Sequence, residues 1–245
     1  MSYSYGLLFL NEEGRFREVH RKAGIEIWGG YGSAFADIDS DGRLDVVVCG
    51  ATEAKGPPII SFFRNQTEGG EWVGFDLLEA KGVQTVGTKV LLLQERGVQL
   101  RQVATTMGSH GQQNDSRIHF GLGEMGAIVD VLVYWPGGRI QSLGTPAPGK
   151  YHTVRRKASR KQKKLHPKGP ERVAVGESAL FTVTPPGRGW KYYWDLGGSR
   201  LPEYTTDVPE LRHVFEHAGQ RVVTVLAVHP RLGGCEARLM VRVVE

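Results

Sequence analysis

Four aspartates within nine residues are the side chains of this chain best suited to chemistry. They are Asp37, Asp39, Asp41 and Asp45. A hard cation such as Ca²⁺ takes six to eight oxygen ligands, and alternating aspartates on a curled loop can direct several carboxylates toward one centre. Gly42 permits the sharp turn that returns Asp45 to this centre, with the backbone carbonyl of Arg43 as a further ligand. The spacing therefore predicts a calcium site.

The residues after the aspartates decide which kind of calcium loop this is. A helical calcium hand needs glutamate at the twelfth loop position, and counting from Asp37 that position holds Val48. Residues 44–49 form a valine-rich apolar run that predicts a buried strand, so the loop joins two strands. A solvated acidic turn is the alternative, because aspartate and glycine form turns whatever they bind. Four carboxylates this close would repel one another without a cation, which favours calcium. Mg²⁺ is disfavoured because it prefers fewer carboxylates.

No arrangement of residues indicates catalysis. The histidines are scattered, and no two of them have the spacing of a zinc site. No Ser/His/Asp, Cys/His or phosphate-loop pattern occurs, since Gly121 and Gly123 lack the third glycine and the helix that a phosphate loop needs. The chain is therefore expected not to be an enzyme. An accessory region of a secreted enzyme is the last-ranked alternative.

Two further groups of side chains are candidates for binding. The first is a polar loop suited to lining a glycan or peptide site, with a merely exposed loop as the alternative. Its members are Ser109, His110, Gln112, Gln113 and Asn114. The second is the run 190–194, which is too rich in aromatic residues for one buried face. We expect core packing for Trp194, and surface binding is the candidate role of Trp190 and Tyr192.

The basic character of the chain is concentrated in one segment. The formal net charge is +5, from 31 basic and 26 acidic residues. Residues 155–168 hold eight basic residues and no acidic one, namely Arg155, Arg156, Lys157, Arg160, Lys161, Lys163, Lys164 and Lys168. The rest of the chain holds 23 basic and 26 acidic residues, a net charge of −3. Charge runs of this kind are usually disordered, so we expect a linker over residues 155–170.

The same segment supports a second class of function. It would dock a polyanion such as nucleic acid, an acidic glycan or a membrane surface, with steeply salt-dependent binding. Nucleic acid is disfavoured as a partner, because the run has no interleaved aromatic residues and no folded scaffold. No apolar stretch has the length of a membrane span.

Composition favours an all-β chain of several short strands. The 245 residues suffice for one large or two ordinary domains, glycine is abundant at 33 residues, and helical patterns are scarce. The first residues have no basic region typical of a signal peptide, so we expect either a cytoplasmic protein or a fragment whose export signal lies elsewhere. Burial as small apolar residues is expected for Cys49 and Cys235, with a disulfide as the alternative.

Residues 1–64 place the aspartate loop among further β patterns. A hairpin is predicted over 6–18, a glycine-rich loop over 23–31 and a strand over 59–63. By Leu-Phe-Leu-Asn, Ala-Gly-Ile and the segment from Gly32 to Asp45, these residues resemble one blade of an integrin-type FG-GAP (VCBS) propeller. This resemblance implies a four-stranded blade with Ca²⁺ held by the aspartates. The loop occurs once, and because propellers need several blades, the blade would pack on a neighbour or belong to a larger assembly.

Residues 65–154 contain a series of ordered landmarks, namely Asn65, Trp72 and the runs 86–90, 119–123 and 133–138. By these landmarks the segment resembles the ASPIC/UnbV domain of the cartilage acidic protein family. Alternating valines at 129, 131 and 133 predict a strand that ends at the Pro-Gly-Gly turn. The resemblance implies a β-rich extracellular module that has no established catalysis.

Residues 171–245 contain Tyr-Trp-Asp-Leu-Gly at 193–197 and His-Val-Phe at 213–215, followed by alternating valines. By these motifs the segment resembles a PKD domain, a small immunoglobulin-like sandwich. This resemblance implies a spacer role and contact with proteins or glycans. Together these resemblances predict a noncatalytic, calcium-binding interaction or adhesion module. We expect it to be extracellular, at the cell surface or periplasmic. Its expected partner is another protein, a further copy of the chain or a glycan.

Overall fold

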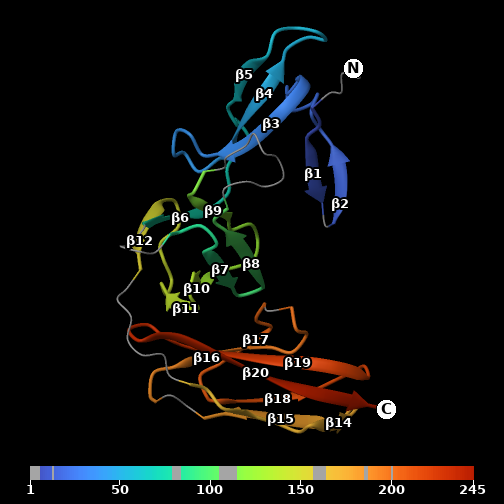
Figure 1. The fold of residues 1–245 in the computed structure, drawn as a ribbon, viewed down its shortest axis with the longest axis vertical. Coiled ribbons are helices and arrows are strands. Elements are labelled where there is room, and N and C mark those ends of the chain that lie inside the picture. Colours follow the sequence, from blue (N-terminus) through green and yellow to red (C-terminus); the bar gives the residue numbers. More distant parts are fainter. Residues whose placement is uncertain are drawn as a thin grey trace. The chain divides into compact units, whose positions relative to one another are not determined.

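The structure is a computed structural model in which all regular secondary structure of the described residues is β-strand (Figure 1). It describes residues 6–12, 14–78, 84–104, 115–156, 164–184, 187–199 and 201–245. The expected all-β class is thereby confirmed. In this part of the chain no helix is long and apolar enough to cross a membrane.

The chain forms two compact units, and each of them draws on separate stretches of sequence. The first unit contains Met1–Asp76, Val103–Gly123 and Pro148–His152. The second contains Leu77–Gln102, Glu124–Ala147 and Thr153–Glu245. The stretch that resembles an ASPIC/UnbV domain therefore contributes to both units.

The first unit opens with a hairpin followed by a three-stranded meander. The hairpin pairs β1 (Phe9–Glu12) with β2 (Arg15–Glu18), as predicted. The meander has the antiparallel order β3 (Trp28–Ala36), β4 (Asp45–Ala51) and β5 (Ile59–Phe63). The four-stranded blade implied by the resemblance is not formed by the described residues, because the hairpin strands pair only with each other.

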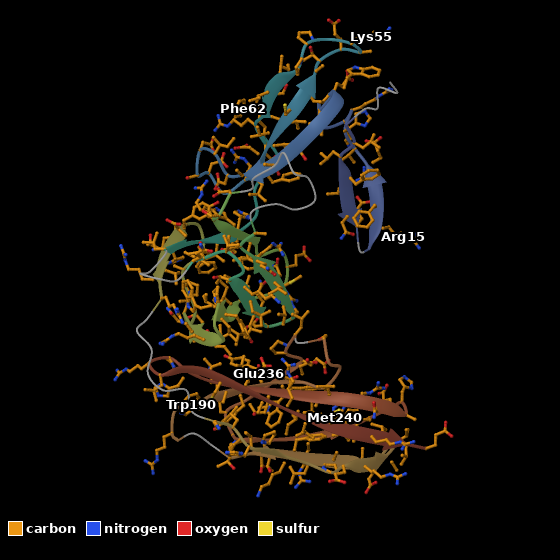
Figure 2. All side chains as sticks on the ribbon, in the orientation of Figure 1. Arg15, Lys55, Phe62, Trp190, Glu236 and Met240 are labelled. Carbon is orange, nitrogen blue, oxygen red and sulfur yellow. The ribbon has the colours of Figure 1, made fainter. Side chains whose placement is uncertain are left out.

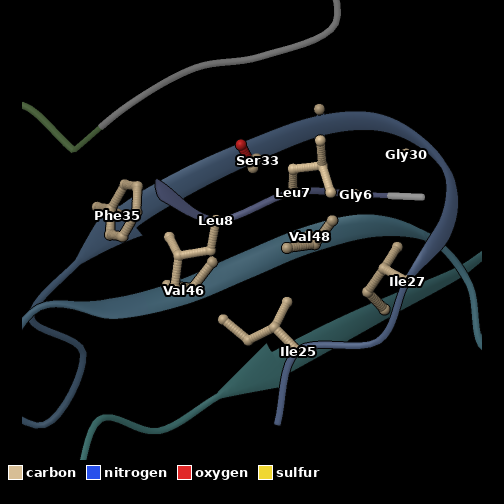
Figure 3. A pocket seen from close by; sticks show the side chains of 11 residues that line it. Gly6, Leu7, Leu8, Ile25, Ile27, Gly30, Ser33, Phe35, Val46 and Val48 are labelled. Atoms are coloured by element: carbon tan, nitrogen blue, oxygen red, sulfur yellow. The ribbon is translucent and has the colours of Figure 1, made fainter. Parts of the chain in front are cut away.

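The two faces of this meander have different surroundings. On one face Leu8, Ile25 and Ile27 pack over Val46 and Val48, beside a half-open apolar cavity of about 280 Å³ (Figure 3). On the other face the register aligns Ala34, Val47 and Phe62. The Phe62 side chain, labelled in Figure 2, is 69% exposed there. One face is thus packed and the other is open.

A further sheet, most of whose residues belong to the first unit, carries the elements that contact the aspartate loop. Its strand order is β12 (Tyr151–Arg155), β6 (Trp72–Leu78) and β9 (Ile118–Gly121). Strand β6 pairs antiparallel with β9, and Phe75 packs edge-on against Phe120, with ring centroids 6.2 Å apart.

The second unit is dominated by one nine-stranded sheet. Its order is β17 (Tyr204–Thr206), β16 (Lys191–Asp195), β19 (Gly219–His229), β20 (Gly233–Val244), β11 (Arg139–Ser142), β10 (Ile128–Trp135), β7 (Lys89–Gln94) and β8 (Gly97–Gln102), with β14 (Arg172–Ala174) parallel to β20. A second sheet has the order β13 (Pro167–Lys168), β15 (Ser178–Val183) and β18 (Glu210–Val214). The large sheet continues from the ASPIC/UnbV-like strands into the C-terminal sandwich through β11 and β20.

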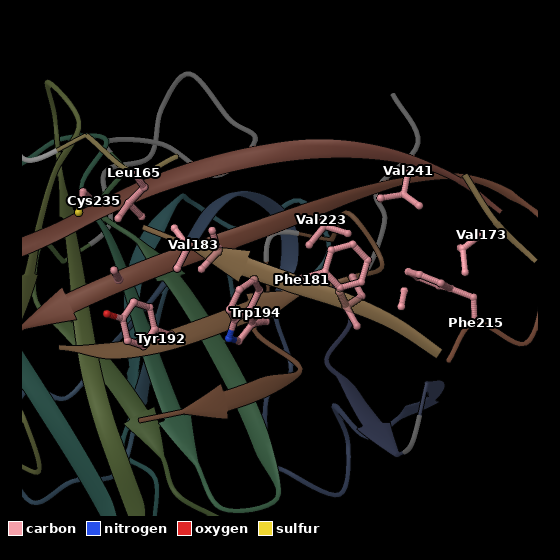
Figure 4. Close-up of a cluster of buried hydrophobic side chains, with 14 of the residues drawn as sticks. Leu165, Val173, Phe181, Val183, Tyr192, Trp194, Phe215, Val223, Cys235 and Val241 are labelled. Carbon is pink, nitrogen blue, oxygen red and sulfur yellow. The ribbon is translucent and has the colours of Figure 1, made fainter. Parts of the chain in front are cut away.

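The C-terminal strands enclose an extensive apolar core. Trp194, Phe181 and Phe215 pack there with Val223 and Val241 (Figure 4). Every second side chain is buried along β15 and is buried or half-buried along β20, as expected for facing sheets of a sandwich. Both cysteines are free thiols; Cys235 is buried in this core and Cys49 is half-buried on β4.

Candidate metal centre

The aspartate loop joins β3 to β4, so the predicted strand-loop-strand arrangement is confirmed. Asp37 and Asp45 are buried, Asp41 is partly buried and Asp39 is exposed. One carboxylate oxygen from each of Asp37, Asp39 and Asp41 lies within 4.8 Å of the other two. These three aspartates supply the hard oxygen donors that Ca²⁺ prefers.

Asp45 has a different role from the other three aspartates. Its Oδ2 accepts the backbone N–H of Ile38 at 3.2 Å, and its Oδ1 accepts the backbone N–H of Asn65 at 2.8 Å. It therefore closes the base of the loop and joins it to the segment after β5. The structure does not place it in the carboxylate group that was predicted to include it.

Hydrogen bonds from the loop backbone to Asp37 fix the shape of the loop. Its Oδ1 accepts the N–H of Asp41 and its Oδ2 accepts the N–H of Gly42, both at 3.0 Å. Ser40 and Gly42 have positive φ angles of 60° and 89°, which turn the chain back over the Asp37 carboxylate. Each of these carboxylate oxygens keeps a lone pair for a cation.

Gly42 also permits a close approach between the loop and the sheet of β12, β6 and β9. A Cβ built on Gly42 would lie 1.9 Å from Nε1 of Trp72. The Gly42 carbonyl contacts Nε2 of His119 at 2.9 Å, and the His119 ring stacks on Trp72 with centroids 5.3 Å apart. The loop is therefore seated on an aromatic platform rather than projecting freely into water.

Arg117 links the loop to this platform. It donates to the carbonyl of Asp37 at 2.7 Å, pairs with Asp115 at 2.8 Å and lies over the Tyr151 ring at 4.7 Å. Burial and the nearby Asp37 carboxylate raise the pKa of Tyr151 above its usual range. Sequence reasoning missed Arg117, because it lies 80 positions from Asp37 and no local spacing connects the two.

Arginines balance part of the negative charge of the loop. Arg43 pairs with Asp41, and Arg64 pairs with Asp39. The backbone N–H of Arg43, supported by the charges of Arg43 and Arg64, lowers the pKa of Asp41. Arg64 is 64% exposed, and exposed ion pairs contribute little to stability. A cation can therefore replace Arg64 beside Asp39 at small energetic cost.

Replacing Arg117 by alanine is expected to destabilise the first unit by about 1–3 kcal/mol, because it removes a bond to a partly buried carbonyl, an ion pair and a cation–π contact. Hydrogen exchange at the amides of Asp41 and Gly42, which close the loop, is the direct readout. Arg238, whose pair with Glu236 lies on the surface, provides the matched control, Arg238→Ala. Equal and small effects of both substitutions would show that Arg117 does not hold the loop.

The aromatic binding residues proposed from the sequence are buried, and that prediction is wrong. Trp190 is only 6% exposed and Tyr192 only 2%, and both belong to the sandwich core. Tyr193, on the other face of β16, is buried as well. Strand β16 is covered on both faces, so its aromatic side chains pack without presenting a binding surface.

The polar loop and much of the basic segment lie outside the described residues. This holds for Ser109, His110, Gln112, Gln113, Asn114, Lys157, Arg160, Lys161 and Lys163. Arg155 ends β12 and Lys168 ends β13, and Leu165 is buried in the sandwich core. The sandwich therefore begins before residue 171, because the expected linker ends in packed structure. Polyanion binding by Arg155, Arg156, Lys164 and Lys168 stays a prediction.

Comparison with known families gives one match. Residues 79–161 match the family described as ASPIC and UnbV. This supports the ASPIC/UnbV resemblance and leaves the FG-GAP resemblance a prediction. The comparison with curated proteins gives no match.

Three solved structures are similar to parts of the chain. The PKD domain of the human VPS10 domain-containing receptor SorCS2 is 30% identical and covers 36% of this chain and 84% of its own, with a TM-score of 0.28. A superoxide reductase (neelaredoxin) from Ignicoccus hospitalis is 16% identical over 34% of this chain and 81% of its own, with a TM-score of 0.26. The fibronectin(III)-like modules of CbhA from Clostridium thermocellum are 12% identical over 73% of this chain and 92% of their own, with a TM-score of 0.28. At such TM-scores these likenesses carry no inference about function.

Proposed function

We propose that this chain is a noncatalytic, calcium-binding interaction module that acts outside the cell or at its surface. The observation that carries the proposal is the convergence of the Asp37, Asp39 and Asp41 carboxylates on a loop closed by Asp45. The ASPIC and UnbV match over residues 79–161 supports a β-rich interaction module.

The donor set fits a hard cation and not a softer metal. All three side chains are carboxylates, and among the described residues they form the one group of three or more side chains placed to hold a metal. Carboxylate oxygens select Ca²⁺ and Mg²⁺ over the metals that prefer nitrogen or sulfur ligands. Bound Ca²⁺ would supply a double positive charge that removes the mutual repulsion of the carboxylates.

The proposed role of the ion is structural, because the loop lies at a junction within the first unit. Asp45 holds the loop to the segment after β5, while Gly42 contacts Trp72 and His119 of the neighbouring sheet. A cation held by Asp37, Asp39 and Asp41 would make this seat more rigid. In this proposal calcium sets how the β3–β4–β5 sheet is presented to a partner.

A protein is the partner class that the exposed residues favour. Ile60 and Phe62 are 65% and 69% exposed on the open face of the β3–β4–β5 sheet, beside the half-buried Val47. Adjacent exposed apolar side chains are typical of protein contact surfaces. A glycan partner remains the alternative taken from the sequence.

Thermal unfolding with and without Ca²⁺ tests the proposal. A ligand that binds only the folded state stabilises it by RT ln(1 + [L]/Kd), about 2.7 kcal/mol at a hundredfold excess over Kd. Ca²⁺ should therefore raise the unfolding temperature of the first unit, and Asp39→Asn should reduce the rise, because it removes one negative charge from the donor set. Asp39 is the chosen site because it is exposed and pairs with the exposed Arg64, whereas Asp37 shapes the loop itself.

The matched control is Glu53→Gln, which removes an exposed carboxylate from the same unit outside the loop. This variant should respond to Ca²⁺ like the wild type. A wild-type unfolding temperature that does not change with Ca²⁺, or a rise in Asp39→Asn as large as in the wild type, would overturn the proposal. An equal rise with Mg²⁺ would contradict the choice of calcium.

A further inference from the structure

Two glycines bring β20 of the sandwich against β11 of the ASPIC/UnbV-like strands within the second unit. Ile140 pairs with Gly234, the register at which these strands meet. A Cβ on Gly234 would lie 2.8 Å from Cβ of Ile140, and one on Gly233 would lie 2.8 Å from the Ile140 carbonyl oxygen. Larger residues at either position would force the strands apart.

Apolar side chains from both sides close this junction. Leu91, Leu132 and Ile140 of the ASPIC/UnbV-like strands pack in one buried cluster with sandwich residues that include Tyr193 and Leu226. Apolar contact of this kind is strong but has no preferred direction. It holds the ASPIC/UnbV-like strands and the sandwich together without specifying their relative orientation.

A buried carboxylate makes directional hydrogen bonds across the junction, which the apolar side chains do not. Asp130 on β10 is 5% exposed, and its Oδ1 accepts hydrogen bonds from its own side of the junction. The donors are Val131 N–H at 2.7 Å, Ser142 Oγ at 2.8 Å and Gly144 N–H at 3.1 Å. These donors fix the carboxylate, and Oδ2 accepts the hydroxyl of Tyr193, from the sandwich, at 2.7 Å.

The environment of Asp130 makes this contact sensitive to the loss of a partner. Burial raises the pKa of Asp130, while its hydrogen bonds act in the opposite direction. A buried carboxylate that loses a donor retains the cost of its desolvation. The arrangement with all donors in place is therefore strongly preferred over any in which Tyr193 has moved away.

We propose that Asp130 and Tyr193 form a buried latch that locks the C-terminal sandwich onto the ASPIC/UnbV-like strands in one orientation. The sandwich and the ASPIC/UnbV-like strands then move as one rigid body. This inference is independent of calcium, since it rests on the second unit alone.

Tyr193→Phe in the full chain tests the latch, because it removes the hydroxyl and keeps the ring. Tyr192→Phe is the matched control, since Tyr192 is the preceding residue of β16, is equally buried and belongs to the sandwich core on the opposite face. Residual dipolar couplings should give one alignment tensor for the sandwich and the ASPIC/UnbV-like strands in the wild type and in Tyr192→Phe. Tyr193→Phe should give two.

Hydrogen exchange at the β11–β20 junction measures how far the loss of the Tyr193 hydroxyl shifts the opening equilibrium of the junction. A hydrogen bond to a charged group corresponds to a roughly tenfold to hundredfold change in an opening equilibrium. Tyr193→Phe should accelerate exchange at Gly234 by such a factor, and Tyr192→Phe should not. One shared alignment tensor in Tyr193→Phe, with exchange equal to that of Tyr192→Phe, would overturn the latch.

Asp130→Asn provides a second, independent variant. It keeps an oxygen for the three donors on its own side and removes the charge that faces Tyr193. If the two side chains act as one latch, the double variant should open little more than either single variant. Strictly additive effects on exchange would contradict a direct partnership.

Discussion

Gly42→Ala is expected to lower the unfolding free energy of the first unit by about 2–5 kcal/mol. Alanine at the φ of 89° found there costs about 1–2 kcal/mol. Its Cβ would also lie 1.9 Å from Trp72 Nε1, within a rigid ring that stacks on His119. Overpacking of this kind costs about 1–3 kcal/mol. Chemical denaturation followed by tryptophan fluorescence measures the loss.

Gly14→Ala is the matched control for the part of the Gly42→Ala destabilisation that comes from the backbone conformation. Gly14 has a φ of 86° in the hairpin of the same unit, and a Cβ there would meet nothing within 4 Å. It should therefore cost only the 1–2 kcal/mol of the left-handed backbone. Equal losses for Gly14→Ala and Gly42→Ala would show that the loop is not seated tightly on Trp72.

Trp194→Ala is expected to destabilise the sandwich by about 3–5 kcal/mol, the usual cost of removing a large buried aromatic side chain. The ring has no exposed surface, and its Nε1 donates to Thr206 Oγ1 at 3.0 Å. Domains of this kind are stable by only about 5–15 kcal/mol, so much of the sandwich stability would be lost. Circular dichroism during urea denaturation measures the change.

Met240→Ala is the control for Trp194→Ala. Met240 lies on β20 of the same sheet, but its side chain is 73% exposed, so truncation should change stability by no more than about 0.5 kcal/mol. A loss of less than about 1 kcal/mol for Trp194→Ala would contradict the position of this ring at the centre of the core.

Local sequence patterns predicted most strands and the aspartate loop. The hairpin β1–β2, the apolar strand β5 and the alternating strand β10 depend on neighbouring residues, so their signals lie within a few positions. The loop was equally local, because Asp37, Asp39 and Asp41 lie on one short turn. The part of the site supplied by the loop itself was therefore visible in the sequence.

The contacts that position these elements were not visible in the sequence. Arg117 reaches the loop from 80 positions away, and Tyr193 reaches Asp130 from 63 positions away. Alternation along β16 indicated which aromatic residues share a face but not whether that face meets water. Both faces are covered, one by the sandwich and the other by the ASPIC/UnbV-like strands, so Trp190 and Tyr192 were misassigned.

The position of β20 in the large sheet has a consequence for the speed of folding. This strand pairs with its neighbour β19 and also with β14 and β11, which come much earlier in the sequence. Pairings between distant segments lower folding rates, because the intervening chain loses conformational entropy before the contacts form. The hairpin β19–β20 should therefore form early, and its docking on β11 should be the slow step that completes the second unit.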